Sequence, residues 1–322
     1  MTSIPIGLIG VGRHGSRYLH HLLSVETGGK LVAISRRNTE EGLRLASEHS
    51  LRYYPNYHEL LADSAIQAVL IVTPPSLNLP IALEAIKHGK AVLMEKPLAL
   101  DQTQGRLIVK AVTQAGTPFM TAQTLRYEPA IRQLQGLASV LGHWKYLSCT
   151  MRFETRPSTL EKNSSWNNHG VLMELGIHLL DLVRVLSQDE IKSVSADMYR
   201  PTSHSPEHLA HIKLITRKGL PCYLDISRVT QGRVTRAEII GTEGQAYADW
   251  TTGIARRVSH GNEVTDYPCP PSATLIALLH DFCQAIRTGS PMSITAEDGL
   301  RAVEIADACY RSAHIGKPVY LS

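Results

Sequence analysis

The feature that most constrains the fold is a glycine motif near the N-terminus. Gly10, Gly12 and Gly15 follow the apolar run at residues 6–9 and precede a helix-like stretch that begins near His14. In a G-x-G-x-x-G motif, the first glycine makes a tight turn, the second lets a pyrophosphate approach the backbone, and the third permits close helix–strand packing. Free N–H groups at the helix start then face the phosphates. The motif predicts a dinucleotide-binding unit.

Strand-like and helix-like segments alternate through the first third of the chain. The strand-like runs lie at residues 6–9, 30–35, 68–72, 91–94 and 119–122. Alternation of this kind predicts an α/β fold with a doubly wound parallel sheet of the Rossmann type. Asn38 and Glu41 have the spacing of a capping box, which predicts a helix from residue 39 to about residue 50.

After residue 122 the pattern changes. Short strand-like runs separated by turn residues fill much of 144–250, and helical stretches are predicted near 171–186, 275–287 and 297–314. Runs joined by short turns favour antiparallel pairing. We therefore predict a Rossmann domain at residues 1–122. Residues 123–322 should form an α+β domain with an open, mostly antiparallel sheet.

Composition excludes several classes of protein. Hydrophobic residues make up 43% of the chain, enough for packed cores, and the formal charge of +4 includes no dense basic block. No nucleic-acid partner is therefore expected. The five cysteines form no C-x-x-C pair, and their spacing suits neither zinc nor a disulfide framework. The apolar run at 68–72 is too short to span a bilayer. These features predict a cytoplasmic protein with no membrane partner.

The end of the second predicted strand carries Ser35, Arg36 and Arg37. An enzyme selective for NAD usually has Asp or Glu here, to bond the adenosine ribose hydroxyls. A serine hydroxyl and arginine forks would instead hold a 2′-phosphate. This favours NADP over NAD, although both arginines could equally be solvated residues before a helix.

Two further motifs follow predicted strands: Thr73-Pro74-Pro75 and Glu95-Lys96-Pro97. In open parallel sheets, ligands bind outside the carboxyl ends of the strands. There, Lys96 could hydrogen-bond a substrate oxygen and stabilise its developing negative charge. The alternative is a lysine that simply extends into solvent.

The predicted helix at 171–186 carries a polar stripe. Glu174, His178 and Asp181 are four and three residues apart, on a helix whose other faces are apolar. His178 is a natural general acid/base because the imidazole pKa lies near neutrality, and Glu174 could orient its ring. The alternative is a satisfied buried histidine beside a surface Asp181. No third ligand accompanies Glu174 and His178, so no metal site is predicted.

The combination of motifs resembles the Gfo/Idh/MocA oxidoreductase family. The resemblance extends through residues 123–129 and 285–313, and so covers essentially the whole chain. Family members often have Asp at the position of Glu174, His at that of Asn78, and a glycine-rich run in place of residues 167–170. These departures leave the substrate identity open.

The resemblance implies an NAD(P)-dependent dehydrogenase or reductase. It would move a hydride between nicotinamide and a sugar, polyol or related hydroxy or carbonyl compound, with Lys96 and His178 in the catalytic positions and Glu174 beside the histidine. It also implies that residues 123–322 bind the substrate and form homodimers or homotetramers through the C-terminal sheet. We assign the cofactor site to Gly10, Gly12, Arg13, His14, Gly15, Ser35, Arg36, Arg37, Thr73, Pro74, Asn78, Glu95, Lys96 and Gln123.

The substrate site is assigned to Tyr127, Trp166 and Asp181. Trp166 could stack on a sugar ring, and a core or interface tryptophan is an equal alternative.

Two other functions fit the same motifs. One is a glycosidase that oxidises its sugar transiently with tightly held NAD, and the NADP-type residues Ser35–Arg37 argue against it. The other is a noncatalytic dinucleotide sensor, which would need neither Lys96 nor His178. Net turnover of a nicotinamide cofactor would separate the enzyme from both.

Overall fold

The computed structural model describes residues 3–155, 169–203 and 205–321. Its contacts divide the chain into an N-terminal unit, Met1–Gln123 with Ala273–Leu300, and a C-terminal unit, Thr124–Ser272 with Arg301–Ser322. The first boundary lies one residue from the predicted one. Residues 273–300, predicted in the second domain, group instead with the first, because the apolar face of helix α9 packs on α1 and β2.

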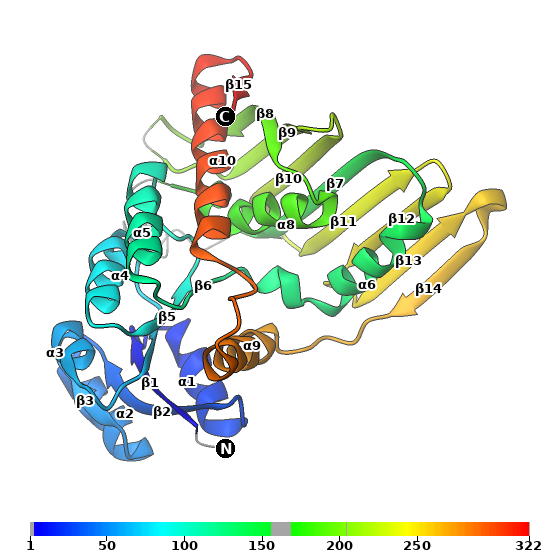
Figure 1. Cartoon of the computed structure of the whole chain (residues 1–322). Coiled ribbons are helices and arrows are strands. Elements are labelled where there is room, and N and C mark those ends of the chain that lie inside the picture. Colours follow the sequence, from blue (N-terminus) through cyan, green and yellow to red (C-terminus); the bar gives the residue numbers. More distant parts are fainter. Residues whose placement is uncertain (1–2, 156–168, 204, 322) are drawn as a thin grey trace. The chain divides into compact units, whose positions relative to one another are not determined.

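Six strands form one sheet in the N-terminal unit, in the order β3-β2-β1-β4-β5-β6. They are β1 (Ile4–Ile9), β2 (Gly29–Ser35), β3 (Arg52–Tyr54), β4 (Ala68–Ile71), β5 (Ala91–Glu95) and β6 (Phe119–Ala122). Every neighbouring pair is parallel, which confirms the predicted doubly wound sheet (Figure 1). All four residues of β4 are buried, as expected of a central strand covered on both faces.

Helices connect these strands. They are α1 (Gly15–Ser24), α2 (Thr39–His49), α3 (Tyr57–Ala62), the 3₁₀ turn η1 (Pro75–Leu77), α4 (Asn78–Lys87) and α5 (Gln102–Ala115). Helix α9 (Thr274–Thr288) connects no strands of this sheet but packs against α1 and β2. The predicted cap of α2 is present, since the Asn38 side chain accepts from the Glu41 N–H at 3.0 Å. The short elements β3 and α3 were not predicted, because a three-residue strand leaves too little periodicity to recognise.

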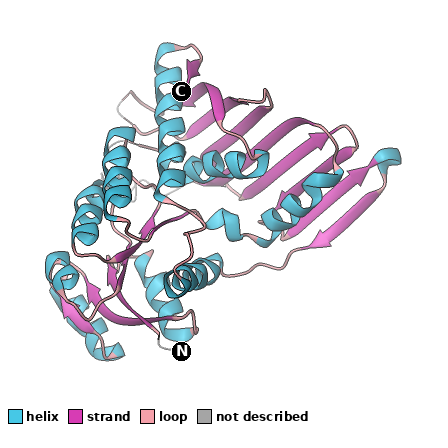
Figure 2. Ribbon diagram, viewed as in Figure 1, coloured by secondary structure: helices cyan, strands magenta, loops and turns pink. Residues whose placement is uncertain are grey.

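The C-terminal unit contains a nine-stranded sheet in the order β14-β13-β12-β11-β7-β10-β9-β8-β15. Its strands are β7 (Trp144–Glu154), β8 (Ile191–Tyr199), β9 (Leu209–Thr216), β10 (Pro221–Thr230), β11 (Val234–Gly241), β12 (Gly244–Asp249), β13 (Ile254–Ser259), β14 (Val264–Pro268) and β15 (Val319–Tyr320). Only β7 and β10 pair in parallel, so the sheet is mostly antiparallel, as predicted (Figure 2).

Helices cover one face of this sheet. The unit contains η2 (Thr124–Tyr127), α6 (Pro129–Leu137), η3 (Ala138–Val140), a π-helical turn η5 (Leu172–Gly176), α8 (Ile177–Ser187), η6 (His260–Asn262) and most of α10 (Ala296–Ile315). Leu147, Cys149 and Met151 of β7 are buried, and the residues that alternate with them are not. Gly176 brings the helix close to β10, because a Cβ there would lie 2.7 Å from Ile226 Cδ1.

Some chemical features of the described residues bear on function. All five cysteines are free and buried. Within residues 3–155, 169–203 and 205–321, no helix is long and apolar enough to cross a membrane. No cluster of three or more His, Cys, Asp or Glu side chains suited to a metal ion was found in those ranges.

Candidate active site

The glycine motif forms the turn that the sequence predicts. Gly10 has φ +92°, and a Cβ there would lie 2.3 Å from the Val72 carbonyl oxygen. A Cβ on Gly15 would lie 2.0 Å from the Gly10 oxygen, so both positions require glycine. A Cβ on Gly12 would meet nothing of the protein within 4 Å. The protein's own packing does not demand glycine at position 12, which fits a backbone left open to a bound ligand.

Arg36 lies against this loop. Its guanidinium Nη1 donates to the Val11 carbonyl, and the Tyr53 hydroxyl donates to the Arg36 carbonyl at 2.9 Å. Ser35 is buried, and Arg37 is exposed. The two arginines of the predicted phosphate site therefore differ: Arg36 is fixed beside the glycine loop, and Arg37 extends toward solvent.

Glu95, at the end of β5, is held by helix α1 and its preceding loop. His14 Nε2 donates to Glu95 Oε1 at 2.6 Å, and the Tyr18 hydroxyl donates to the same oxygen at 2.7 Å. Burial alone would raise the pKa of Glu95, but the hydrogen bond from His14 and the charges of His14 and Lys96 outweigh it and lower that pKa. Glu95 is therefore an ionised, buried carboxylate next to Lys96.

Asn78, predicted to contact the cofactor, is buried and holds together two loops of the candidate cofactor site. Its side chain is 1% exposed, and its Nδ2 donates to the Pro97 carbonyl at 2.8 Å. Thr73 Oγ1 lies 3.3 Å from Asn78 Oδ1. Asn78 thus ties the loop after β4 to the loop after β5, which positions Thr73 and Lys96 for any ligand at this edge.

Gln123, after β6, carries an unusual buried amide. The residue is 1% exposed, and neither amide atom has a hydrogen-bond partner among the described residues. Burying an unpaired amide costs free energy, so such groups commonly serve a ligand. A carboxamide group, such as that of nicotinamide, offers the complementary donor and acceptor.

All of these residues follow strands of one parallel sheet and therefore lie along its carboxyl edge. The glycine loop could hold a pyrophosphate, Arg36 a ribose phosphate, and Gln123 a carboxamide. The residues present therefore fit a nicotinamide dinucleotide.

Between Val171 and Val183 of the C-terminal unit, only Glu174 and His178 are partly exposed, and the other residues are buried. Glu174 lies within a π-helical turn, and His178 follows that turn closely. Such turns are often found at functional sites. The predicted polar stripe therefore reaches the surface at these two positions.

Glu174 is not a free carboxylate. Arg228 of β10 holds it in a two-pronged ion pair, with Nε 2.8 Å from Oε2 and Nη2 2.7 Å from Oε1. The Arg228 guanidinium also lies 5.4 Å from the ring centre of Phe153. Such a fork fixes both the position and the charge of the carboxylate.

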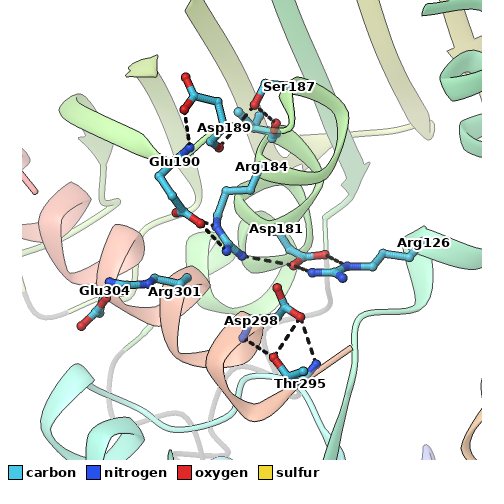
Figure 3. Close-up of polar contacts among 11 residues, drawn as sticks. Arg126, Asp181, Arg184, Ser187, Asp189, Glu190, Thr295, Asp298, Arg301 and Glu304 are labelled. Carbon is cyan, nitrogen blue, oxygen red and sulfur yellow. Dashed lines mark hydrogen bonds and ion pairs between the residues drawn. The ribbon is translucent and has the colours of Figure 1, made fainter. Parts of the chain in front are cut away.

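Asp181 was predicted to contact the substrate, but the structure buries it in an ion pair. Its side chain is 2% exposed, and Arg126 donates to both oxygens, with Nε at 2.8 Å and Nη2 at 2.6 Å. Arg184 Nη1 lies 3.9 Å away and its Nη2 pairs with Glu190 at 2.7 Å (Figure 3). A carboxylate already engaged in this way positions helix α8 and leaves little surface for a substrate.

Tyr127 and Trp166 were also predicted to contact the substrate. Tyr127 is buried, with the Arg132 guanidinium 5.1 Å from its ring centre, so the ring offers little surface to a sugar. Trp166 lies outside the described residues.

A buried carboxylate anchors the start of the histidine helix. Glu207 is fully buried, and its Oε1 accepts from the N–H groups of Gly170 and Leu172 at 3.0 and 3.1 Å and from the Tyr310 hydroxyl at 2.7 Å. A negative charge is favourable at a helix N-terminus. A Cβ on Gly170 would lie 2.0 Å from the Glu207 carbonyl oxygen, so this position requires glycine.

Comparison with known proteins identifies the family. Residues 4–123 match the oxidoreductase family with an NAD-binding Rossmann fold, and residues 137–247 match the GFO/IDH/MocA C-terminal domain. The chain belongs to the Gfo/Idh/MocA family. It is an NAD(P)-dependent oxidoreductase that acts on CH–OH groups, which confirms the class of enzyme predicted from the motifs.

Several relatives match over nearly their whole length. The chain is 26% identical to an inositol 2-dehydrogenase of Burkholderia cenocepacia, over 98% of this chain and 95% of the relative. It is 25% identical to a scyllo-inositol 2-dehydrogenase (NAD⁺) of Bacillus subtilis, over 99% and 96%. The solved aldose-aldose oxidoreductase of Caulobacter crescentus shares the fold, with a TM-score of 0.87, 22% identity and coverage of 99% and 100%.

Sequence reasoning missed three residues that organise the candidate site: Tyr18, Arg228 and Glu207. Tyr18 lies one turn beyond the glycine motif, so helical spacing could have found it. Arg228 and Glu207 come from the C-terminal sheet and the loop between its strands β8 and β9. No local pattern links them to the helix that they hold.

Proposed function

We propose that the enzyme oxidises a hydroxyl group of a cyclic polyol or a sugar, or reduces the corresponding carbonyl, and prefers NADP to NAD. The observation that carries the proposal is the carboxyl edge of the parallel sheet. There the glycine loop, Arg36 and the Glu95–Lys96 turn follow strands of one sheet, in a chain of this family. The relatives named as inositol dehydrogenases support the class of substrate.

Lys96 and His178 divide the acid–base work in this proposal. The glycine loop and Gln123 would hold a nicotinamide dinucleotide, which would supply hydride transfer to and from the carbinol carbon of the substrate. The Lys96 ammonium would hold the substrate oxygen and stabilise its negative charge. His178 would take the hydroxyl proton as hydride leaves, and return it in the other direction. Because Arg228 binds both oxygens of Glu174 and so holds it as a fixed carboxylate, we assign the proton transfer to His178.

A substrate screen tests this function. Cyclic polyols, aldoses, ketones and dihydrodiols would be offered with NADP and with NAD, and reduced nicotinamide followed by absorbance. We expect turnover with cyclic polyols or sugars. Tight cofactor binding with no turnover across the panel would contradict the proposal and favour a sensor.

The NADP preference rests on Ser35, Arg36 and Arg37, with no carboxylate among them. Arg36 already lies on the glycine loop, and its remaining N–H groups are suited to a 2′-phosphate. Losing a charge-assisted hydrogen bond typically costs about 1.5–3 kcal/mol, so Arg36→Ala should weaken NADP binding by about tenfold or more. Affinity for NAD should barely change.

Calorimetric titration with both cofactors would measure these affinities. Arg37→Ala provides the comparison, since the exposed arginine should contribute less than Arg36. Equal affinity of the unaltered protein for NADP and NAD would contradict the NADP assignment.

We also propose that two copies of the chain associate through the outer face of the nine-stranded sheet. Among the residues that the structure describes, helices cover only the other face, and the outer one carries a hollow of about 540 Å³ lined by residues of β7 to β10. Tyr146 and Tyr223 stack there, with ring centres 5.4 Å apart. Aromatic side chains are enriched in interfaces. Sedimentation should give a dimer or tetramer, and a pure monomer at micromolar concentration would contradict this assignment.

The proposed location is the cytoplasm. All five cysteines are free and buried, which favours a reducing compartment. Cell fractionation would test this, and recovery of the protein outside the cytoplasm would contradict it.

A further inference from the structure

One carboxylate in the N-terminal unit connects three elements of the candidate cofactor site. Glu95 Oε1 accepts from His14 Nε2 and from the Tyr18 hydroxyl, at 2.6 and 2.7 Å. Its other oxygen, Oε2, accepts from the Lys96 backbone N–H at 3.1 Å. The glycine loop, helix α1 and the end of β5 therefore meet at this side chain.

The three groups around Glu95 differ in their surroundings. Tyr18 is among the largest fully buried side chains, and burial raises the pKa of its hydroxyl far above the ordinary value, so it acts only as a donor. The Glu95 side chain is also buried. The His14 side chain is 45% exposed, and its ring meets that of Tyr18 edge-on, with centres 5.6 Å apart. His14 is thus the member of the cluster that a ligand on the glycine loop can touch.

These bonds constrain Lys96 directly. The backbone of Lys96 is fixed through its N–H, and the charges of Glu95 and Lys96 interact. A buried carboxylate with two donors on one oxygen has a defined orientation, so it can align the residue that follows it. Loss of either donor frees Glu95 to rotate and releases that alignment.

We propose that His14 and Tyr18 are positioning residues for Lys96, acting through Glu95, and that His14 links occupancy of the glycine loop to the alignment of the lysine. This inference rests on the proposed function only for the catalytic role of Lys96. The alignment itself is a property of the N-terminal unit. No part of the cluster other than Lys96 needs to touch the substrate.

Two single variants break the cluster. Tyr18→Phe removes one hydroxyl with little change of volume, and His14→Ala removes the donor on the loop. His14→Gln keeps an N–H donor and should rescue. The N-terminal unit offers matched controls, because the Tyr54 hydroxyl bonds to Asp63 at 2.7 Å and His58 bonds to Glu84 at 2.7 Å. Tyr54→Phe and His58→Ala remove the same kinds of bond away from Lys96.

The first measurement does not depend on activity. The full-length protein, with and without NADP, would be treated with limiting acetic anhydride, and acetylation of Lys96 compared with that of Lys110 by peptide mass spectrometry. We expect Tyr18→Phe and His14→Ala to change the Lys96 rate severalfold and to abolish its response to NADP. The control variants should keep the behaviour of the unaltered protein, and His14→Gln should recover part of what His14→Ala loses.

The second measurement is steady-state kinetics. Misalignment of a reacting group can cost up to about a hundredfold, so Tyr18→Phe and His14→Ala should lower kcat by about tenfold while KM for the substrate changes little. An unchanged Lys96 acetylation rate in both variants would overturn the inference, whatever the melting temperature does. A changed acetylation rate with unchanged kcat would support the alignment and contradict the catalytic role of Lys96.

Discussion

The surroundings of Lys96 and of His178 are built in opposite ways. Lys96 follows a strand, and the residues that fix its neighbourhood, His14 and Tyr18, lie on the loop and helix after another strand of the same sheet. His178 lies on a helix held by arginines about 55 residues away in the chain, Arg126 and Arg228. Both sets of partners are distant in the chain, but strand ends gather polar groups through the topology of the sheet, whereas the helix depends on specific arginine–carboxylate ion pairs.

The largest expected effect comes from removing the side chains of His178 and Lys96. General acid–base catalysis by a positioned side chain contributes about 10²–10⁴-fold, so His178→Ala should lower kcat by that order and leave cofactor affinity intact. Lys96→Ala should act similarly, with some loss of cofactor affinity. Lys96→Arg should rescue poorly, because a planar guanidinium cannot replace a compact ammonium.

Steady-state kinetics measures kcat, and titration of the same preparations with the cofactor measures cofactor affinity. Full activity in both alanine variants would remove the basis for comparing the two regions at all.

The second effect concerns the stability of the C-terminal unit. Arg126→Met leaves the buried Asp181 carboxylate without its two-pronged partner, and breaking such a pair typically costs about 3–5 kcal/mol. The double variant Arg126→Met with Asp181→Leu should recover much of that loss. Urea unfolding measures both. Arg44→Ala, which breaks exposed pairs with Glu41 and Glu48, should leave stability nearly unchanged.

If Arg126→Met lowered the free energy of unfolding as little as Arg44→Ala, helix α8 would not depend on the Arg126–Asp181 ion pair. The contrast between the two regions would then disappear.

Much of the N-terminal unit could be predicted from the sequence, because the patterns that indicate it are local. The turn at Gly10, the cap at Asn38 and the strand ends each follow from a few adjacent residues. The roles of Asp181 and Glu174 could not be predicted, since helical spacing shows that residues share a side but not what lies opposite. Their partners, Arg126 and Arg228, are brought close only by the tertiary fold.

A third effect tests whether Glu174 must be held. Arg228→Met should lower kcat by about tenfold, because an unpaired carboxylate beside the histidine helix can move and change its hydrogen bonds. Arg228→Lys should recover part of the loss, since lysine keeps the charge without the fork. The pH profile of kcat is the sharper measurement: it should shift in Arg228→Met. An unchanged kcat and an unchanged pH profile would show that the Arg228–Glu174 pair has only a structural role.

The smallest effect is on the pH dependence of stability. A hydrogen bond from Arg184 lowers the pKa of Glu190 in the folded chain. A depressed folded pKa stabilises the fold above the ordinary carboxyl range, and that contribution is lost as pH falls through the folded value. Glu190→Gln should therefore reduce the melting temperature at neutral pH and have little effect in acid. An equal fall in melting temperature at neutral and at acidic pH would contradict the predicted pH dependence.

The most direct test of the central claim is a crystal structure of the enzyme with NADP and a polyol or sugar bound. The proposal requires Lys96 Nζ and one ring nitrogen of His178 to lie within about 2.6–3.2 Å of the same substrate oxygen, with the carbinol carbon facing the nicotinamide. A structure in which the two side chains open onto separate pockets, or contact different parts of the substrate, would contradict the shared role assigned to them.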